Sequence, residues 1–355
     1  MTMPLQLDDY RLLGRSGLRV SPLALGTMTF RVGQGSWGSS DEEAKRLVDT
    51  FTDRGGNFID TADFYGQHGG SETLLGELVA DRRHRMVIST KYSLTTEPGN
   101  PNASGNHRKN MVRSVEDSLK RMGTDYIDLL YLHMWDFRTP VDEILRSFDD
   151  LVRAGKVLYI GLSDTPAWQA SRMQAIAELR GWTQFCALQI QYSLVERTVE
   201  RELIPMAQEM GLGVSPWAPL GQGMLTGKYT RADLKPGDMS DISSRKAINA
   251  VTGKLTERNL DIADVVVEVA KEIGCTPAQL AVAWTLTNPA VASPVIGVRT
   301  PEQLEDNLGA LAVDISADQL ARLEAVSAVP PVFPMDVLRG PAEGMMFGGV
   351  KVQER

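Results

Sequence analysis

Cysteine and histidine are scarce in this sequence of 355 residues. Its two cysteines, Cys186 and Cys275, are far apart and belong to no motif, so a disulfide-rich secreted domain is excluded. Three of its four histidines, His68, His84 and His107, have no metal-ligand spacing with one another or with a cysteine. We therefore predict buried thiols in a reducing compartment and no metal site.

The sequence also lacks a net positive charge and long apolar runs. The formal net charge is -8 and no basic patch is interleaved with aromatics, which argues against nucleic acid or an anionic membrane as a partner. No run approaches the roughly 18 apolar residues of a membrane span. The first residues show neither a basic region nor an apolar region of a secretory signal. We expect a cytoplasmic protein.

What the sequence does contain is a regular alternation of strand-like and helix-like segments. After a hairpin signal at 10–21, strands are predicted to start near residues 22, 58, 86, 127, 157, 187, 213 and 293. Strands that alternate with helices form a parallel sheet, and eight such units predict a (β/α)8 TIM barrel.

A doubly wound sheet is the alternative, but no Gly-x-Gly-x-x-Gly follows the first strand. No linker divides the chain, so residues 1–355 are expected to form a single domain. Two additions to the barrel are predicted, a long loop at 221–256 after strand seven and extra C-terminal helices that include 315–326.

Capping signals predict where several of the helices begin. Serine or threonine followed three residues later by glutamate or glutamine forms a capping box, and proline is favoured at the first helical position. Such starts are predicted at Ser40–Glu43, Ser71 with Glu72 in the first turn, Thr139 before Pro140, Thr276–Gln279 and Thr300–Gln303.

Polar side chains stand where three neighbouring strands end. Asp60 ends the second strand, Lys91 the third and His133 the fourth, while Tyr65 follows Asp60 in the loop. Taken singly, Asp60 could cap a turn and Tyr65 could pack. Active sites of TIM barrels lie at the carboxyl ends of the strands, so these four groups would converge there. We predict that they form a catalytic cluster.

These residues resemble the aldo-keto reductase family. The resemblance rests on Asp60-Thr-Ala, Tyr65-Gly, Ser71-Glu72, the lysine of Ile-Ser-Thr-Lys and the histidine of Leu-His. It extends from Arg11 to Ala310, and the subgroup is similar to the bacterial and fungal aryl-alcohol-dehydrogenase-like members. It implies metal-free, reversible hydride transfer between NADP(H) and a small carbonyl or alcohol substrate.

The resemblance also implies a role for each catalytic residue. Tyr65 would be the general acid in reduction and the general base in oxidation. A free phenol titrates at about 10, and the ammonium of Lys91 would lower that pKa. Asp60 would hold Lys91, and His133 would orient the substrate oxygen and could relay a proton.

Cofactor positions carry over in the same way. Ser163, Asp164 and Gln189 match residues that bind the nicotinamide carboxamide, although the family more often has Asn or Arg in place of Asp164. Trp217 matches the aromatic that stacks on the nicotinamide, and its structural alternative is a core tryptophan. The pyrophosphate would meet backbone amides of the loop Ala218, Pro219, Leu220, Gly221 and Gly223 and the side chain of Lys228.

The last motif follows the eighth strand. A helix start beside an arginine is a phosphate site, and the family binds the adenosine 2′-phosphate and the adenine here; the structural alternative is a simple capping box. The matching residues are Gly297, Arg299, Gln303, Asp306 and Asn307, with Asp306 where the family often has glutamate.

Aromatic residues in loops beyond the strand ends could wall an apolar substrate pocket. These are Phe30, Trp37, Phe64 and Trp135, and the tail from Pro330 could fold over them. Two other functions stay open. Potassium-channel β subunits share the fold as redox-responsive NADP(H)-binding modules, but have Asn in place of His133. An isomerase would leave the cofactor motifs unexplained. Substrate identity, direction and oligomeric state, including a possible homo-oligomer, also stay open.

Overall fold

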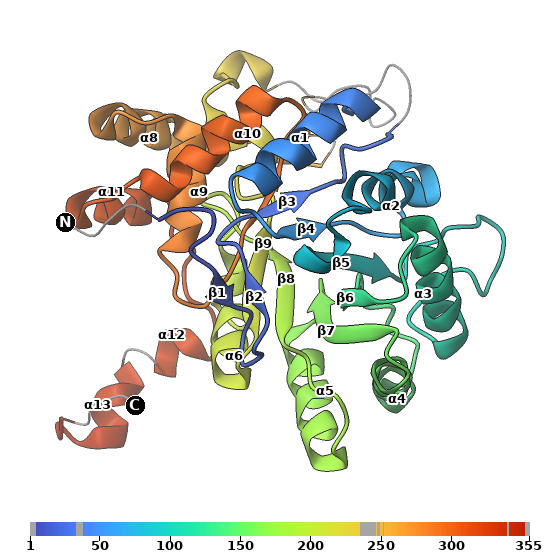
Figure 1. Ribbon diagram of the computed structural model, residues 1–355. Helices are drawn as coiled ribbons and strands as arrows, with labels where there is room; N and C mark the ends of the chain where they lie inside the picture. Colours follow the sequence, from blue (N-terminus) through green and yellow to red (C-terminus); the bar gives the residue numbers. More distant parts are fainter. Residues whose placement is uncertain are drawn as a thin grey trace.

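The chain folds into a closed barrel of eight parallel strands (Figure 1). The computed structural model describes residues 5–32, 38–234, 246, 249–250, 252–338 and 341–351. In barrel order the strands are β10 (Val295–Gly297), β3 (Ala24–Gly26), β4 (Phe58–Asp60), β5 (Val87–Tyr92), β6 (Ile127–Leu132), β7 (Val157–Ser163), β8 (Ala187–Gln191) and β9 (Gly213–Trp217). The last strand pairs with both β3 and β9 and closes the ring. The predicted (β/α)8 barrel is confirmed.

A short hairpin precedes the barrel, as predicted. Its strands, β1 (Arg11–Leu12) and β2 (Arg19–Val20), pair antiparallel. Leu13 and Val20 of the hairpin are fully buried and pack in one cluster with Phe58 and Tyr131 of the barrel strands. The hairpin covers the end of the barrel opposite the carboxyl ends of the strands. Burial of Leu13 and Val20 holds it there, because apolar area removed from water stabilises by about 25 cal/mol per Å².

Helices surround the barrel (Figure 1). They bury their apolar faces against the outside of the strands in one large cluster, as expected for a parallel sheet covered by crossover helices. These helices are α1 (Asp41–Asp53), α2 (Tyr65–Val79), α3 (Arg108–Met122), α4 (Val141–Arg153), α5 (Ala167–Arg180), α6 (Leu203–Met210), α8 (Glu257–Ile273), α9 (Pro277–Leu286), α10 (Pro301–Leu308) and α11 (Ala317–Ser327). Two short helices follow them, α12 (Met335–Leu338) and α13 (Pro341–Phe347).

Two of the predicted capping boxes are confirmed and one helix start is wrong. Ser40 and Thr276 each cap their helix reciprocally with the residue three positions on. The start predicted at Thr139 fails because its hydroxyl donates to Asp136 Oδ2 (2.6 Å) instead. The helix therefore begins one residue later than predicted, and Pro140 occupies the cap position.

The helix expected to start at Ser71 is confirmed to within one residue. α2 spans Tyr65–Val79, but residues 66–69 have positive φ and break it, so its regular right-handed part begins at Gly70. The Ser71 hydroxyl is buried and donates to the Thr27 carbonyl oxygen (2.9 Å), so it ties the helix to the loop after β3 and caps nothing. At α10, Thr300 accepts from the Gln303 amide as predicted, but the Gln303 side chain accepts from the amide of Arg299.

The described residues of the long segment after β9 include two 3-10 helices, η3 (Gly221–Thr226) and η4 (Arg231–Asp233). Residues 235–245, 247–248 and 251 of the predicted loop 221–256 lie outside the described part of the chain. The additional C-terminal helices are confirmed. The tail from Pro330, for which folding over the pocket was left open, carries α12 and α13, which stand apart from the barrel in the view of Figure 1. In the described part of the chain no helix combines the length and apolarity needed to cross a membrane.

Gly76 of α2 packs closely against the backbone of Met122 in α3, and its replacement by alanine is predicted to destabilise the protein. A Cβ at this position would lie 2.5 Å from the backbone oxygen of Met122. Alanine improves helix propensity by about 1 kcal/mol, whereas overpacking costs about 1–3 kcal/mol. We expect Gly76→Ala to lower the free energy of unfolding in urea by up to about 2 kcal/mol. Gly70→Ala is the control, because its nearest neighbour is the flexible side chain of Arg31 at 3.4 Å; equal effects would contradict the prediction.

Candidate active site

A fully buried ion pair lies at the carboxyl ends of β4 and β5. Lys91 Nζ donates to Asp60 Oδ2 (2.6 Å) and to the Thr61 carbonyl oxygen (2.8 Å), and neither side chain has appreciable exposure. Burial lowers the pKa of Lys91, but the carboxylate of Asp60 and the phenol of Tyr65 outweigh it and raise the pKa above its usual value. Lys91 is therefore a permanent cation at neutral pH.

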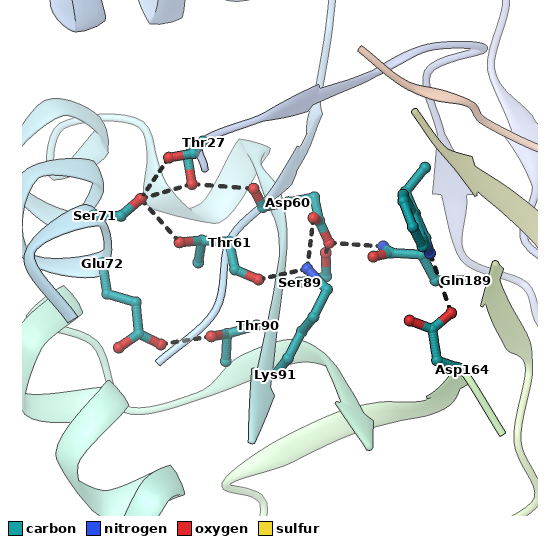
Figure 2. Close-up of polar contacts among 11 residues, drawn as sticks. Thr27, Asp60, Thr61, Ser71, Glu72, Ser89, Thr90, Lys91, Asp164 and Gln189 are labelled. Atoms are coloured by element: carbon teal, nitrogen blue, oxygen red, sulfur yellow. Dashed lines mark hydrogen bonds and ion pairs between the residues drawn. The ribbon is translucent and has the colours of Figure 1, made fainter. Parts of the chain in front are cut away.

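The second oxygen of Asp60 is also occupied (Figure 2). Asp60 Oδ1 accepts from the Ser89 hydroxyl (2.7 Å) and from Gln189 Nε2 (2.9 Å). A buried carboxylate must have its lone pairs satisfied or it destabilises the fold. These contacts from β5 and β8 lock the acid, and with it the lysine, in one position.

Tyr65 and His133 lie beside this pair. The ammonium of Lys91 is 5.0 Å from the centre of the Tyr65 ring, and the rings of Tyr65 and His133 meet edge to face at 5.9 Å. The four side chains predicted to converge do so.

The titration of Tyr65 differs from the expectation. Burial raises the pKa of the phenol above 10 and exceeds the lowering by the Lys91 charge. Burial and the Lys91 charge also lower the pKa of His133 to about 3. Both rings are therefore neutral at pH 7, and His133 can donate or accept a hydrogen bond but is not an imidazolium that could act as an acid. Its Nδ1 is buried and has no hydrogen-bond partner within the described residues.

A second set of buried charges, not predicted as functional, lies behind the cluster. Glu72 accepts from Arg121 Nε (2.6 Å) and from the hydroxyl of Thr90 (2.5 Å), which neighbours Lys91 (Figure 2). Asp63 is buried beside this pair, and neither of its oxygens has a hydrogen-bond partner in the described part of the chain. The signals in the sequence were the second acid in Asp60-Thr-Ala-Asp63 and the Glu72 of Ser71-Glu72.

The three residues expected at the nicotinamide carboxamide lie together at the ends of β7 and β8. Ser163 pairs in register with Gln189, whose side-chain nitrogen is occupied by Asp60. Asp164 has a positive φ of 38° and accepts from Trp217 Nε1 (3.1 Å). The aspartate that departs from the family pattern therefore holds the edge of the predicted stacking aromatic.

The loop predicted to present amides to pyrophosphate is tightly turned. Ala218, Gly221 and Gly223 all have positive φ. The N–H groups of Gly221 and Gly223 donate to carbonyl oxygens within the loop, and Pro219 has no N–H. In this structure these three positions therefore offer no unused N–H donor to a pyrophosphate. Lys228 does lie here, because a Cβ on Gly223 would be 2.9 Å from its Nζ.

The motif after β10 divides into two parts. Gly297, Arg299 and Gln303 are exposed around the start of α10, although the Gln303 side-chain oxygen accepts from the Arg299 amide. Asp306 points elsewhere, because it accepts from Thr276 and Gln279 of α9 and joins the two helices. Asn307 is buried.

A cavity of about 460 Å³ lies next to Asp164 and Trp217. Trp135 and Phe137 form an aromatic wall, with ring centres 6.5 Å apart. Trp135 was predicted to line a pocket, but Phe137 was missed.

The other predicted wall residues fare differently. Phe30 has no exposed surface and belongs to the core, so it cannot line the pocket. Phe64 is 40% exposed and contacts His68. Trp37 lies outside the described residues. Within the described part of the chain, no group of three or more histidine, cysteine or acidic side chains is arranged to hold a metal.

Comparison with known proteins identifies the family. Residues 22–328 match the model of the Aldo/keto reductase family. This chain belongs to the aldo-keto reductases. It is 40% identical over 346 residues to a norsolorinic acid reductase of Emericella nidulans, covering 94% of this chain and 86% of that one. It is 38% identical to an aryl-alcohol dehydrogenase of Pestalotiopsis microspora, over 90% and 82%.

A third relative, a putative aryl-alcohol dehydrogenase of Saccharomyces cerevisiae, is 34% identical over 94% of this chain and 91% of its own length. The family and these relatives make the chain an oxidoreductase that acts on carbonyl or alcohol groups of small molecules. Aldo-keto reductases use nicotinamide cofactors, generally NADPH.

Asp63 is predicted to make the protein less stable as the pH rises. Burial and the charge of Glu72 raise its pKa to about 8, against the opposing effects of Arg121, Ser114 and Lys91. An unfolded aspartate titrates near 3.9, so between about pH 4 and pH 8 the folded state binds more protons, and stability falls by up to about 1.4 kcal/mol per pH unit.

Asp63→Asn removes this titration. The stability of the variant relative to the parent should therefore increase from pH 5 to pH 8, measured by urea unfolding at each pH. Asp117→Asn, at a more exposed position on α3, should show no such trend. A constant difference for Asp63→Asn at all pH values would contradict the assignment.

Proposed function

We propose that the chain is an NADPH-dependent carbonyl reductase and alcohol dehydrogenase in which Tyr65 is the general acid and base. The observation that carries this proposal is the buried Asp60–Lys91 pair beside the two neutral rings of Tyr65 and His133. A carbonyl that accepts a hydride becomes an alkoxide and needs a proton. A neutral phenol next to a fixed cation is suited to supply it.

The residues around the site fit a nicotinamide dinucleotide phosphate, which supplies or accepts the hydride when bound. Trp217 is half-buried, and its edge is fixed by Asp164. Lys228 lies over the tightly turned loop after β9, and Arg299 is exposed at the start of a helix. These cationic groups suit two phosphate positions. We do not include Asp306 or the amides of Gly221 and Gly223 among the proposed cofactor-binding groups, because each already forms hydrogen bonds within the protein.

Proton transfer and orientation are divided between two side chains. Tyr65 gives its proton to the substrate oxygen during reduction and takes it back during oxidation. Lys91 stabilises the phenolate that reduction leaves behind. His133 hydrogen-bonds the same substrate oxygen as a neutral ring and aims it at Tyr65. With a pKa of about 3, His133 is a donor in a hydrogen bond and not the proton source.

The substrates proposed are aryl aldehydes and aryl alcohols. The cavity beside Trp217 is walled by Trp135 and Phe137, whose faces and edges suit a flat ring. Relatives named aryl-alcohol dehydrogenases support this choice. The competing function is a redox-responsive binding module like the channel β subunits. His133 favours the enzyme, because a module needs no donor aimed at a substrate.

Tyr65→Phe is predicted to lower turnover of an aryl aldehyde by about 10²–10⁴-fold, since general acid catalysis contributes about that much. Affinity for NADPH, measured by fluorescence quenching, should be largely kept. Because the pKa of Tyr65 is above 10, reduction by the parent should stay level to about pH 9 and fall only where the phenol ionises. Alcohol oxidation, which needs the phenolate, should rise with pH over the same range. Turnover by the variant close to that of the parent would refute the role of Tyr65.

Arg299→Ala is predicted to weaken NADPH more than NADH. A guanidinium at a helix start forms charge-assisted hydrogen bonds with a 2′-phosphate, which NADH lacks. The dissociation constant for NADPH should rise about tenfold or more, while that for NADH changes little. Arg172→Ala removes an exposed arginine of α5 and is the control. Equal weakening of both cofactors by Arg299→Ala would contradict the assignment.

His133→Asn separates the two proposed functions. Loss of one donor aimed at the substrate oxygen typically costs about 10²–10³-fold in turnover, with NADPH affinity retained. A parent protein that oxidises its bound NADPH only once, on a broad panel of aldehydes and ketones, would favour the binding module instead.

A further inference from the structure

A second cavity lies at the opposite end of the barrel from the Asp60–Lys91 pair. Its volume is about 720 Å³. The walls come from three segments: the hairpin around Arg11, the end of α6 with the residues up to Gly213, and the connection 286–292 between α9 and β10. Gly213, which lines this cavity, is the first residue of β9, whereas Trp217, beside the active site, is the last. The cavity therefore lies at the amino ends of the strands. None of its lining residues belongs to the catalytic cluster.

Two arginines line this cavity. Arg11 is half-buried, and its Nη1 donates to the Val291 carbonyl oxygen at 3.3 Å. Arg15 donates from its amide to the Gly211 carbonyl oxygen (2.9 Å) and from Nη2 to the Glu209 carbonyl oxygen (3.0 Å). A Cβ on Gly211 would lie 2.2 Å from the Arg15 side chain, so a glycine is needed here for Arg15 to lie as it does.

Neither arginine has a counter-ion among the residues that the structure describes. The cavity lining contains no aspartate or glutamate, and no ion pair joins Arg11 or Arg15 to an acid within the residues that the structure describes. Other arginines with little exposure, Arg83, Arg121 and Arg197, each bind a carboxylate. Arg11 is half-buried and Arg15 is exposed, and both guanidinium groups donate to backbone carbonyl oxygens in a protein whose formal charge is -8.

The electrostatics of Arg11 agree with this geometry. Burial lowers the pKa of Arg11. The arginines whose pKa is raised all have carboxylate partners: Arg31, Arg82, Arg197, Arg231 and Arg322. A cation that has lost part of its hydration without gaining a counter-ion is destabilised, and an anion bound in the cavity would relieve that cost.

We propose that this cavity is a binding site for a small organic carboxylate, separate from the active site. The guanidinium groups of Arg11 and Arg15 would bind the carboxylate, since their planar donors match its geometry. Leu12, Leu286 and Pro289 give the cavity apolar walls, which favour an organic body over a bare inorganic anion.

The test measures binding of benzoate to the full chain saturated with NADPH, so that the cofactor's own phosphate positions are filled. Isothermal titration is compared for the parent, Arg11→Met, Arg15→Met and the control Arg172→Met, which removes an equal charge from an exposed position on α5. Benzamide is the neutral analogue of the probe, and inorganic phosphate is the anion without an apolar body. Hydrogen exchange of 11–20 and 286–292 locates the bound probe.

We expect benzoate to bind the parent and to slow exchange in both segments. Arg11→Met should weaken this binding at least tenfold and Arg15→Met by a smaller factor, while Arg172→Met should leave it unchanged. Benzamide should not bind at the site, and NADPH-linked turnover of the variants should equal that of the parent. Circular dichroism melting checks folding, and if Arg11→Met is unfolded, Arg15→Met decides.

Three results would overturn the proposal. The first is the absence of saturable benzoate binding that depends on Arg11 or Arg15. The second is protection elsewhere in the chain with no change at 11–20 or 286–292. The third is phosphate binding as tight as benzoate binding with the same dependence on Arg11, which would make the site a general anion site. All three are independent of the catalytic roles proposed for Tyr65 and His133.

Discussion

The structure of the active site depends on the burial of one ion pair, Asp60 with Lys91. Removing two charges from water costs several kcal/mol per ion, which their attraction offsets only when the remaining donors and acceptors are satisfied. Here Ser89, Gln189 and the Thr61 carbonyl oxygen satisfy them. These partners come from three different parts of the barrel wall, so the closed barrel is what makes a buried lysine possible.

The neutral side chains around that pair follow from the same burial. The desolvation that is tolerated for a paired lysine keeps the rings of Tyr65 and His133 uncharged. A site with one fixed cation, one neutral phenol and one neutral imidazole has its charges arranged before any substrate arrives. Such preorganisation is the usual source of electrostatic catalysis. Asp63 and Glu72 are further buried acids behind the site. We expect them to affect the stability of the fold more than the catalytic reaction.

The two ends of the barrel carry different chemistry. At the carboxyl ends of the strands, cations meet acids or the proposed cofactor. At the amino ends, the hairpin closes the barrel with Leu13 and Val20 and leaves Arg11 and Arg15 beside an open cavity without counter-ions. Strand direction separates these ends, because every barrel strand runs the same way. A ligand at the hairpin end would therefore act on the protein without contacting the catalytic residues.

Local patterns in the sequence determined the barrel and the catalytic cluster. Strand and helix periodicity gave eight units, and since parallel strands end on one side, Asp60, Lys91 and His133 had to meet there. Capping boxes at Ser40 and Thr276 were predictable because they involve only residues three apart. Most of what failed involved distant partners: Ser71 caps nothing because it is held by Thr27, and Asp306 is held by Gln279. The cap predicted at Thr139 was lost to a near neighbour, Asp136. Phe30 is buried in the core, and Trp217 is oriented by Asp164. The sign of the Tyr65 pKa shift was also decided by tertiary structure, because desolvation depends on everything packed around a group and not on its neighbours in the chain.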